Sequence, residues 1–281
     1  MRTVITITAA VLAASAFSAP ALAQTATPAS PVPTVKVHGL HLVKVNLPRT
    51  HLPHLTPNAV VSSKNWSGYA AVAKSGVRLR YVAADFTVPS VSCANSTLGS
   101  SGLAYASNWA GIDGFSSSTV EQTGVDSFCD TSGTAQYDAW YEMFPLDPVA
   151  FSGVSPGDAI AVSVYYNGSV YSLTLNDLTT GSQIQTSQPC PHGSTCRDSS
   201  AEVITEDPGS AEPTVDLADF GMANVTGAAV TSVSGTHGTL AANSLWTSTE
   251  IVMKDSSKKT MAQPSSLYGG QAFNVRWMAA Q

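Results

Sequence analysis

Short runs in which apolar and polar residues alternate follow one another through most of the chain. The clearest pair is Ala159–Tyr166 and Ser169–Leu175, which Asn167-Gly168 separates. Asn-Gly between two alternating runs is a strong hairpin signal, because both turn residues need a positive φ. The pattern therefore predicts two antiparallel strands joined by a two-residue turn.

Similar runs recur along the chain, separated by Gly, Asn, Ser and Pro. No segment has the apolar spacing of an amphipathic helix. Many evenly spaced short strands predict an all-β sandwich or barrel. The expected strands are 69–73, 80–88, 103–112, 119–126, 135–146, 200–206, 214–220, 247–253 and 271–278.

The first 23 residues have the pattern of a secretion signal. Arg2 supplies the positive start, Val4 to Phe17 the apolar run, and Ala21-Leu22-Ala23 a small-residue cleavage site. The apolar run is too short and too rich in Ala and Ser for a membrane span. The sequence predicts a signal peptide over residues 1–23 and an exported protein, extracellular or periplasmic, with no membrane attachment after its removal.

Residues 24–62 differ in composition from the residues that follow. They contain six prolines, four histidines and three basic residues, and no acidic residue. Two interpretations are open: a disordered linker, which the proline content favours, and a propeptide. Residues 63–281, about 219 in number, are enough for one domain with a sizeable core.

The distribution of charge favours the propeptide. All 19 acidic residues lie at Asp85 or later, whereas four of the 13 basic residues lie before residue 63. Nine basic against 19 acidic residues leave residues 63–281 with a net charge near −10. We expect a basic arm to be held on this acidic body by charge and released as carboxylates are protonated. The propeptide is the expected inhibitor, and nucleic acid is not an expected partner.

Four cysteines in an exported chain are expected to form disulfides. Four cysteines allow three pairings. Cys190 and Cys196 bound a short local loop, which leaves Cys93 to pair with Cys129. A metal site is disfavoured, because His192 lies between two cysteines but no second cluster has ligand spacing.

Two motifs of other hydrolases occur in contexts that do not suit them, and few histidines are present for a third arrangement, the Ser–His triad. Gly153-Val-Ser-Pro-Gly157 matches a nucleophile elbow, but a proline and a strand follow where a helix is needed. Cys129-Asp-Thr-Ser-Gly133 has one extra residue before its glycine and no second copy, so it does not support an aspartic dyad. Only the histidines His192 and His237 lie beyond residue 62, so few candidates exist for the histidine of a Ser–His triad.

Polar residues at strand spacing mark the segment 108–126. Trp109 shares one strand face with Gly111 and Asp113, and Gln122 shares another with Gly124 and Asp126. A buried glutamine needs hydrogen-bond partners. By itself, Gln122 fits an ordinary strand residue with satisfied hydrogen bonds better than a functional one.

Motifs from one end of residues 63–281 to the other occur in a fixed order. They are Asn65-Trp-Ser-Gly68, Phe86-Thr-Val-Pro89, Trp109–Gly114, Gln122–Asp126, Tyr137–Glu142, Ala201–Asp207 and Ala218-Asp-Phe-Gly221. Together they resemble the glutamic peptidases (eqolisins), acid endopeptidases that work with a glutamine and a glutamate. The resemblance implies a sandwich of two large antiparallel sheets, similar to a legume lectin or concanavalin-like jelly roll.

The resemblance assigns the catalytic positions to Gln122 and Glu206, with Glu202 as a supporting neighbour. Glu202 and Glu206 are four residues apart and face the same side of a strand. The sequence departs from the family at Val203 and Pro208, where aromatic residues are usual. These changes keep both acids but alter the expected substrate pocket.

The implied chemistry follows from the residue types. A carboxylate with an ordinary pKa near 4.3 can act as a base in mild acid, where histidine is protonated. An amide keeps its N–H donors at any pH and can stabilise an oxyanion. Peptide hydrolysis by this pair needs no metal or cofactor. The resemblance adds supporting or substrate-binding residues: Trp66, Trp109, Asp113, Asp126, Asp138, Glu142, Glu202 and Phe220.

Each supporting residue also has a structural interpretation. The tryptophans are equally compatible with a core, which we prefer for Trp140, and the acids with the surface. The expected protein is a monomer that cleaves protein or peptide substrates. A non-catalytic lectin-like domain that binds carbohydrate is the main alternative, and a glycosidase with paired carboxylates is a second. Neither alternative needs Gln122.

Overall fold

The computed structural model describes residues 33–44, 55–56, 59–209 and 215–280. The expected signal peptide lies outside the described residues, as do residues 24–32, 45–54 and 57–58 of the expected propeptide. All regular structure in the described part is β-strand, so this part contains no helix long and apolar enough to cross a membrane.

The strands range from two to 11 residues, and Gly, Asn, Ser and Pro occur at many of the turns between them. Their bounds are β1 Thr34–His38, β2 His41–Val43, β3 Val60–Ser63, β4 Trp66–Ala73, β5 Leu79–Thr87, β6 Leu103–Asp113, β7 Val120–Cys129, β8 Ala135–Phe144, β9 Val149–Ser152, β10 Ala159–Tyr166, β11 Tyr171–Asp177, β12 Gln183–Gln188, β13 Ser200–Glu206, β14 Val215–Leu217, β15 Met222–Ser232, β16 His237–Gly238, β17 Trp246–Lys254, β18 Thr260–Pro264 and β19 Phe273–Trp277.

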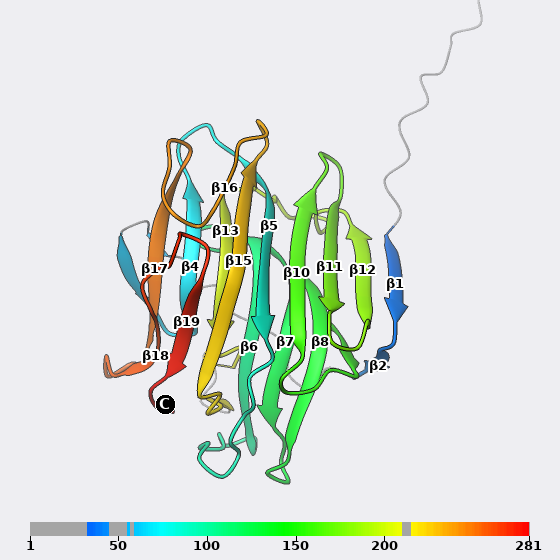
Figure 1. Ribbon diagram of the computed structural model, residues 1–281, viewed down its shortest axis with the longest axis vertical. Coiled ribbons are helices and arrows are strands. Elements are labelled where there is room, and N and C mark those ends of the chain that lie inside the picture. Colours follow the sequence, from blue (N-terminus) through cyan, green and yellow to red (C-terminus); the bar gives the residue numbers. More distant parts are fainter. Residues whose placement is uncertain (1–32, 45–54, 57–58, 210–214, 281) are drawn as a thin grey trace, which may run out of the picture. The chain divides into compact units, whose positions relative to one another are not determined.

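Two antiparallel layers make up the fold. Layer A has the strand order β17-β4-β13-β6-β7-β8-β9. Layer B has the order β19-β15-β5-β10-β11-β12. In Figure 1 the strands of layer B run side by side in front of β13, β6, β7 and β8. The expected antiparallel β-sandwich is confirmed.

The two layers are joined along one side. Strand β18 pairs with β17 of layer A and with β19 of layer B, so the hydrogen-bonded sheet continues from one layer to the other. On the opposite side the layers end at β9 and β12, where β2 and β1 are added to them. Two pairings are parallel, β3 with β17 and β14 with β6.

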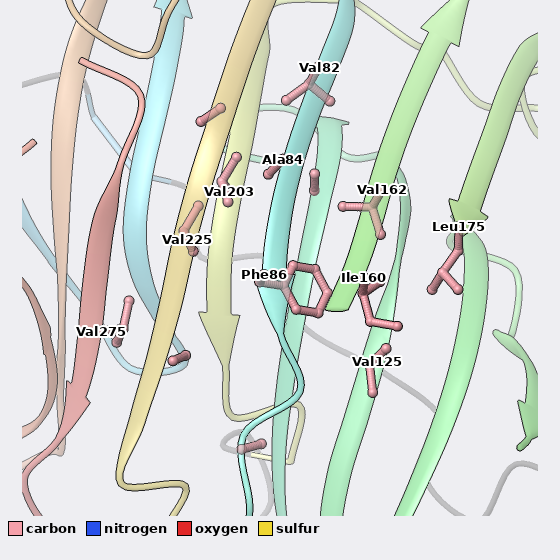
Figure 2. Packing of buried hydrophobic residues seen from close by; sticks show 14 of the residues in the cluster. Val82, Ala84, Phe86, Val125, Ile160, Val162, Leu175, Val203, Val225 and Val275 are labelled. Atoms are coloured by element: carbon pink, nitrogen blue, oxygen red, sulfur yellow. The ribbon is translucent and has the colours of Figure 1, made fainter. Parts of the chain in front are cut away.

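The main core fills the space between the layers. Phe86 and Ile160 of layer B and Val125 and Val203 of layer A all belong to this core, and Figure 2 shows Phe86, Ile160 and Val125 close together. Because successive strand residues point to opposite faces, alternate positions of layer A point into this core and the others point away. The face of layer A that points away is called the outer face below.

Both disulfides form as expected. Cys93 pairs with Cys129, which ties the segment before β6 to the end of β7. Cys190 pairs with Cys196 within the loop before β13. The described residues contain no free cysteine.

Candidate active site

Gln122 and Glu202 lie in one row across the outer face of layer A. The register pairs Gln122 with Gly111 and with Glu142, and pairs Gly111 in turn with Glu202. Two strand spacings therefore separate the Gln122 and Glu202 backbones, about 10 Å. Both side chains are long and point to the same side of the sheet.

Gly111 provides the space between them. A Cβ atom at this position would lie 3.0 Å from the Gln122 Cβ and 3.1 Å from Cζ3 of Trp109. Contacts this short would push Gln122 or Trp109 aside, since protein interiors leave few voids. The glycine in the first strand motif thus keeps the region between the glutamine and the glutamate open.

One hydrogen bond fixes the side-chain amide of Gln122. Its Nε2 donates a hydrogen bond of 2.5 Å to Oε2 of Glu142, the cross-strand neighbour. Its Oε1 is buried and accepts no hydrogen bond from a described residue. An amide with one fixed donor and one unused acceptor can accept a hydrogen bond from a water molecule, and its second N–H can donate to a substrate oxygen.

Glu202 is fully buried. Burial raises the pKa of its carboxyl well above the ordinary value, and the charge of Asp113 raises it further. Ser200 and the Phe115 N–H oppose this rise, although neither makes a hydrogen bond of good geometry to a carboxyl oxygen of Glu202.

Glu206 lies on the same face, four residues further along β13. This spacing corresponds to about 13 Å along the strand. Its carboxyl accepts hydrogen bonds from Trp109 Nε1 at 2.8 Å and from Asn65 Nδ2 at 3.3 Å. Its register neighbours are Trp66 and Ser107 rather than the Gln122 row.

Tryptophans form the apolar floor of the outer face. Trp66 and Trp109 meet edge to face with their ring centroids 4.9 Å apart. They belong to an outer-face cluster that comprises Trp66, Ala70, Val72, Trp109, Phe115, Val120, Trp140, Ala150, Ile204 and Ile251. Trp140 is fully buried, as expected of a core residue, but it belongs to this cluster and not to the core between the layers.

Two expected acids form a pair at the edge of this floor. Asp126 and Asp138 are cross-strand neighbours on β7 and β8. Burial raises the pKa of Asp138 to about 6, and the nearby Asp126 carboxylate adds to the shift. Ser107 Oγ donates a hydrogen bond to Asp126. The pair gives this end of the outer face an acidic character.

Two other expected residues make contacts that are structural. Asp113, at the end of β6, accepts hydrogen bonds from the N–H groups of residues 197–199 and from Ser199 Oγ, at 2.6 to 2.8 Å. It thereby fixes the chain just before β13. Phe220 is buried in the core between the layers.

Sequence reasoning missed the contact between Phe115 and Leu55. Phe115 follows the turn after β6, is fully buried and belongs to the outer-face cluster. Leu55, from the expected propeptide, donates its N–H to the carbonyl of Phe115 at 2.6 Å and packs against the same cluster. Local sequence gives no signal for a contact between residues 60 positions apart.

The site contains carboxylates and an amide as its polar groups. Within the described ranges, no group of three or more His, Cys, Asp or Glu side chains is arranged to hold a metal ion. The arrangement can supply a carboxyl for proton transfer, an amide for hydrogen bonding and an apolar floor for a peptide chain.

Comparison with known proteins gives consistent matches. A family model described as the peptidase A4 family matches residues 64–277. Aspergillopepsin-2 from Aspergillus niger is 38% identical over 194 residues, which cover 63% of this chain and 67% of the relative. Scytalidopepsin B from Scytalidium lignicola is 38% identical over 148 residues, about half of each chain.

Solved structures agree with the family match. The structure of scytalido-glutamic peptidase with a peptide-based transition-state analog matches with a TM-score of 0.60 at 27% identity. The match covers 76% of this chain and 98% of the other. A structure of an eqolisin-family peptidase in complex with the tripeptide Ala-Ile-His matches with a TM-score of 0.58 at the same identity and coverage.

Proposed function

The chain belongs to the peptidase A4 family, the glutamic peptidases, and on that premise we propose that it is an acid endopeptidase made as an inactive precursor. Gln122 and a glutamate of β13 are the proposed catalytic residues. The observation that carries the assignment is the cross-strand row in which Gln122 and Glu202 flank Gly111. The carbohydrate-binding alternative has no support from the family match.

We assign the base to Glu202 rather than Glu206. The family resemblance by itself favours Glu206, but the register favours Glu202, which shares the row of Gln122. Both oxygens of Glu206 are engaged by Asn65 and Trp109. Glu206 then acts by holding the Trp109 indole in the floor of the site.

The reaction needs one proton shuttle and one oxyanion donor. Glu202, ionised once solvent reaches it, takes a proton from water while the water oxygen attacks the peptide carbonyl carbon. The Gln122 N–H stabilises the oxyanion, a contribution worth about 10²–10³ in rate in other hydrolases. Glu202 then gives the proton to the leaving amine as the C–N bond breaks.

The precursor form accounts for the burial of these residues. Val43, Leu55 and Val61 of the expected propeptide all pack against the outer-face cluster. Leu55 also bonds to Phe115, whose own N–H approaches Glu202. Removing this cover would admit solvent and substrate, and would lower the pKa of Glu202 toward its ordinary value.

Export of the protein is supported by its disulfides. Both pairs form in the structure, and such bonds persist in oxidising compartments. The expected signal peptide over residues 1–23 fits this location. We propose secretion as a soluble precursor.

Cleavage of a denatured protein at acidic pH tests the assignment. The full-length protein, Gln122→Ala, Glu202→Gln and Glu206→Gln are each pre-incubated in acid and assayed, with circular dichroism as the control for folding. We expect Gln122→Ala and Glu202→Gln to lose at least about 10²-fold in rate. Glu206→Gln, the matched control on the same strand face, should keep more activity.

Three outcomes contradict parts of this proposal. If Glu206→Gln is inactive and Glu202→Gln is active, the base is Glu206. If Gln122→Ala cleaves like the wild type, the glutamine has no catalytic role. If the folded wild-type protein cleaves nothing across the acid range, the endopeptidase proposal fails as a whole.

A further inference from the structure

The residues 34–43, called the clasp below, hold together the side of the sandwich that is otherwise open. Strand β1 pairs with β12 of layer B over five residues, from Thr34 opposite Ser187 to His38 opposite Gln183. Strand β2 pairs with β9 of layer A over three residues. Two residues, Gly39 and Leu40, join β1 to β2, so the clasp crosses from one layer to the other within a single turn.

The strands β9 and β12 end their layers on this side. Apart from the clasp, β12 pairs with β11 and β9 pairs with β8 among the described strands. Figure 1 shows β1 beside β12 at the end of layer B. Each clasp strand thus satisfies a row of edge N–H and C=O groups that would otherwise face solvent.

Leu40 anchors the clasp in the core. It is buried within the cluster between the layers, whereas nearly all other clasp residues are exposed. Gly153, after β9, leaves room for it, because a Cβ there would lie 3.1 Å from the Leu40 Cδ2. Gly39 has a φ of +70°, and a Cβ there would lie 2.3 Å from Ser182 Oγ before β12. The turn fits closely between the two layer ends.

The pairing itself is neutral. The strands β12 (Gln183–Gln188) and β9 (Val149–Ser152) contain no charged residue. The clasp contributes Lys36, His38 and His41, with Lys44 just beyond it. The acids nearest along these elements are Asp147 just before β9, Asp138, which pairs with Ser152 opposite His41, its neighbour Asp126, and Asp177 at the end of β11. Asp177 is already engaged by Thr179 and Thr180.

From these contacts we propose that the pairing of residues 34–43 with the edges of β9 and β12, together with the buried Leu40, keeps the propeptide on the precursor. The inference rests on the proposed function, because it assigns to the clasp the role of keeping the propeptide on the precursor. Leu55 and Val43 pack against the outer-face cluster, while strand pairing and Leu40 supply the attachment. Since backbone pairing and Leu40 carry that attachment, protonating carboxylates alone does not release the clasp, in contrast to an arm held by charge.

The full-length protein and two matched variants test the proposal. Leu40→Ala empties the core position, while Leu42→Ala removes the same side chain from a position that is 72% exposed. Hydrogen exchange measured by mass spectrometry reports the protection of β9 and β12. The delay before a denatured protein is cleaved at acidic pH reports propeptide release.

We expect the β9 and β12 amides of Leu40→Ala to exchange about tenfold faster or more, and the delay to shorten several-fold. Leu42→Ala should change neither quantity. Raising the salt to about 0.5 M should leave the exchange unchanged, because charge does not hold the clasp. If Leu40→Ala does not fold, Leu40→Val makes the same comparison with a smaller change.

Three results would overturn the proposal. In the first, the β9 and β12 amides of the wild type exchange as fast as those of exposed strands. In the second, salt speeds their exchange as much as Leu40→Ala does, and in the third, Leu40→Ala exchanges faster but the delay before cleavage is unchanged. If no variant ever cleaves protein, the proposed function fails on its own. The exchange measurements then still decide whether the clasp is bound.

Discussion

Glu142 is the residue that fixes Gln122 in the proposed site. Its carboxyl accepts the 2.5 Å hydrogen bond from the Gln122 amide and is itself buried. We expect Glu142→Ala to leave the amide free to rotate, and to lower kcat about tenfold or more with a smaller change in KM, because misplaced groups lose transition-state stabilisation. Steady-state kinetics on a peptide substrate give this separation.

The conservative variant distinguishes positioning from a general structural effect. Glu142→Gln keeps an acceptor oxygen for the Gln122 amide and should recover much of the lost kcat. Equal losses in Glu142→Ala and Glu142→Gln would mean that the charge of Glu142, and not its hydrogen bond, matters.

The choice between the two glutamates of β13 shows what sequence alone leaves open. Alternation places Glu202 and Glu206 on one face, and the structure agrees. Which of them shares the row of Gln122 depends on the register of β13 against β6 and of β6 against β7. Register is set by tertiary packing across both layers, so local sequence does not specify it.

Strands with regular alternation were predictable, and strands without it were not. The Ala159–Tyr166 and Ser200–Glu206 strands have the expected bounds. The 11-residue strand β15 was missed, because its register shifts between Thr226 and Ala229 and Gly227 adopts a φ of +63° there. A bulge of this kind interrupts the period-two pattern. Strand β12 was missed because four of its six residues are Gln or Ser.

The two disulfides close loops of different length and should differ in their effect on stability. Cys93–Cys129 spans 36 residues, whereas Cys190–Cys196 spans six. Loop-closure entropy predicts a loss in unfolding free energy of about 4 kcal/mol for the first and about 2 kcal/mol for the second. Paired Cys→Ser variants, unfolded in guanidinium chloride, measure both values.

Each disulfide variant is the control for the other. A larger loss of unfolding free energy on removing Cys190–Cys196 than on removing Cys93–Cys129 would contradict the entropy argument. It would indicate that the loop before β13, which Asp113 holds through three backbone N–H groups, contributes more than its length suggests.

Buried carboxyls lead us to expect a protein that is more stable at acidic than at neutral pH. Glu121 is fully buried in the core between the layers, and neither of its oxygens makes a hydrogen bond of good geometry. Burial raises its pKa well above the ordinary 4.5, and the charges of Asp113 and Asp198 raise it further. Below pH 4.5 the carboxyl is neutral in both the folded and unfolded chains, so it costs nothing.

The loss of stability follows as the pH rises. Above 4.5 the unfolded chain ionises at Glu121 while the folded chain does not, so unfolding becomes more favourable. Glu202 acts in the same direction, and so does Asp138, whose pKa burial raises from 3.8 to about 6. Asp130 has the opposite effect, because its hydrogen bonds, first the one from Ser132, lower its pKa to about 2. Its contribution to stability is therefore lost as the pH falls below about 4. Stability is therefore expected to be highest near pH 4.

Thermal unfolding between pH 4 and pH 7 measures this dependence. The Tm of the wild type should fall over this range. The side chain of Glu121→Gln cannot ionise, so the Tm of this variant should fall less and should be higher than that of the wild type at pH 7. Asp147→Asn, at an exposed carboxyl, is the matched control and should keep the wild-type slope. A wild-type Tm that rises toward pH 7, or a Glu121→Gln slope equal to that of the wild type, would show that buried carboxyls do not set the working pH of this fold.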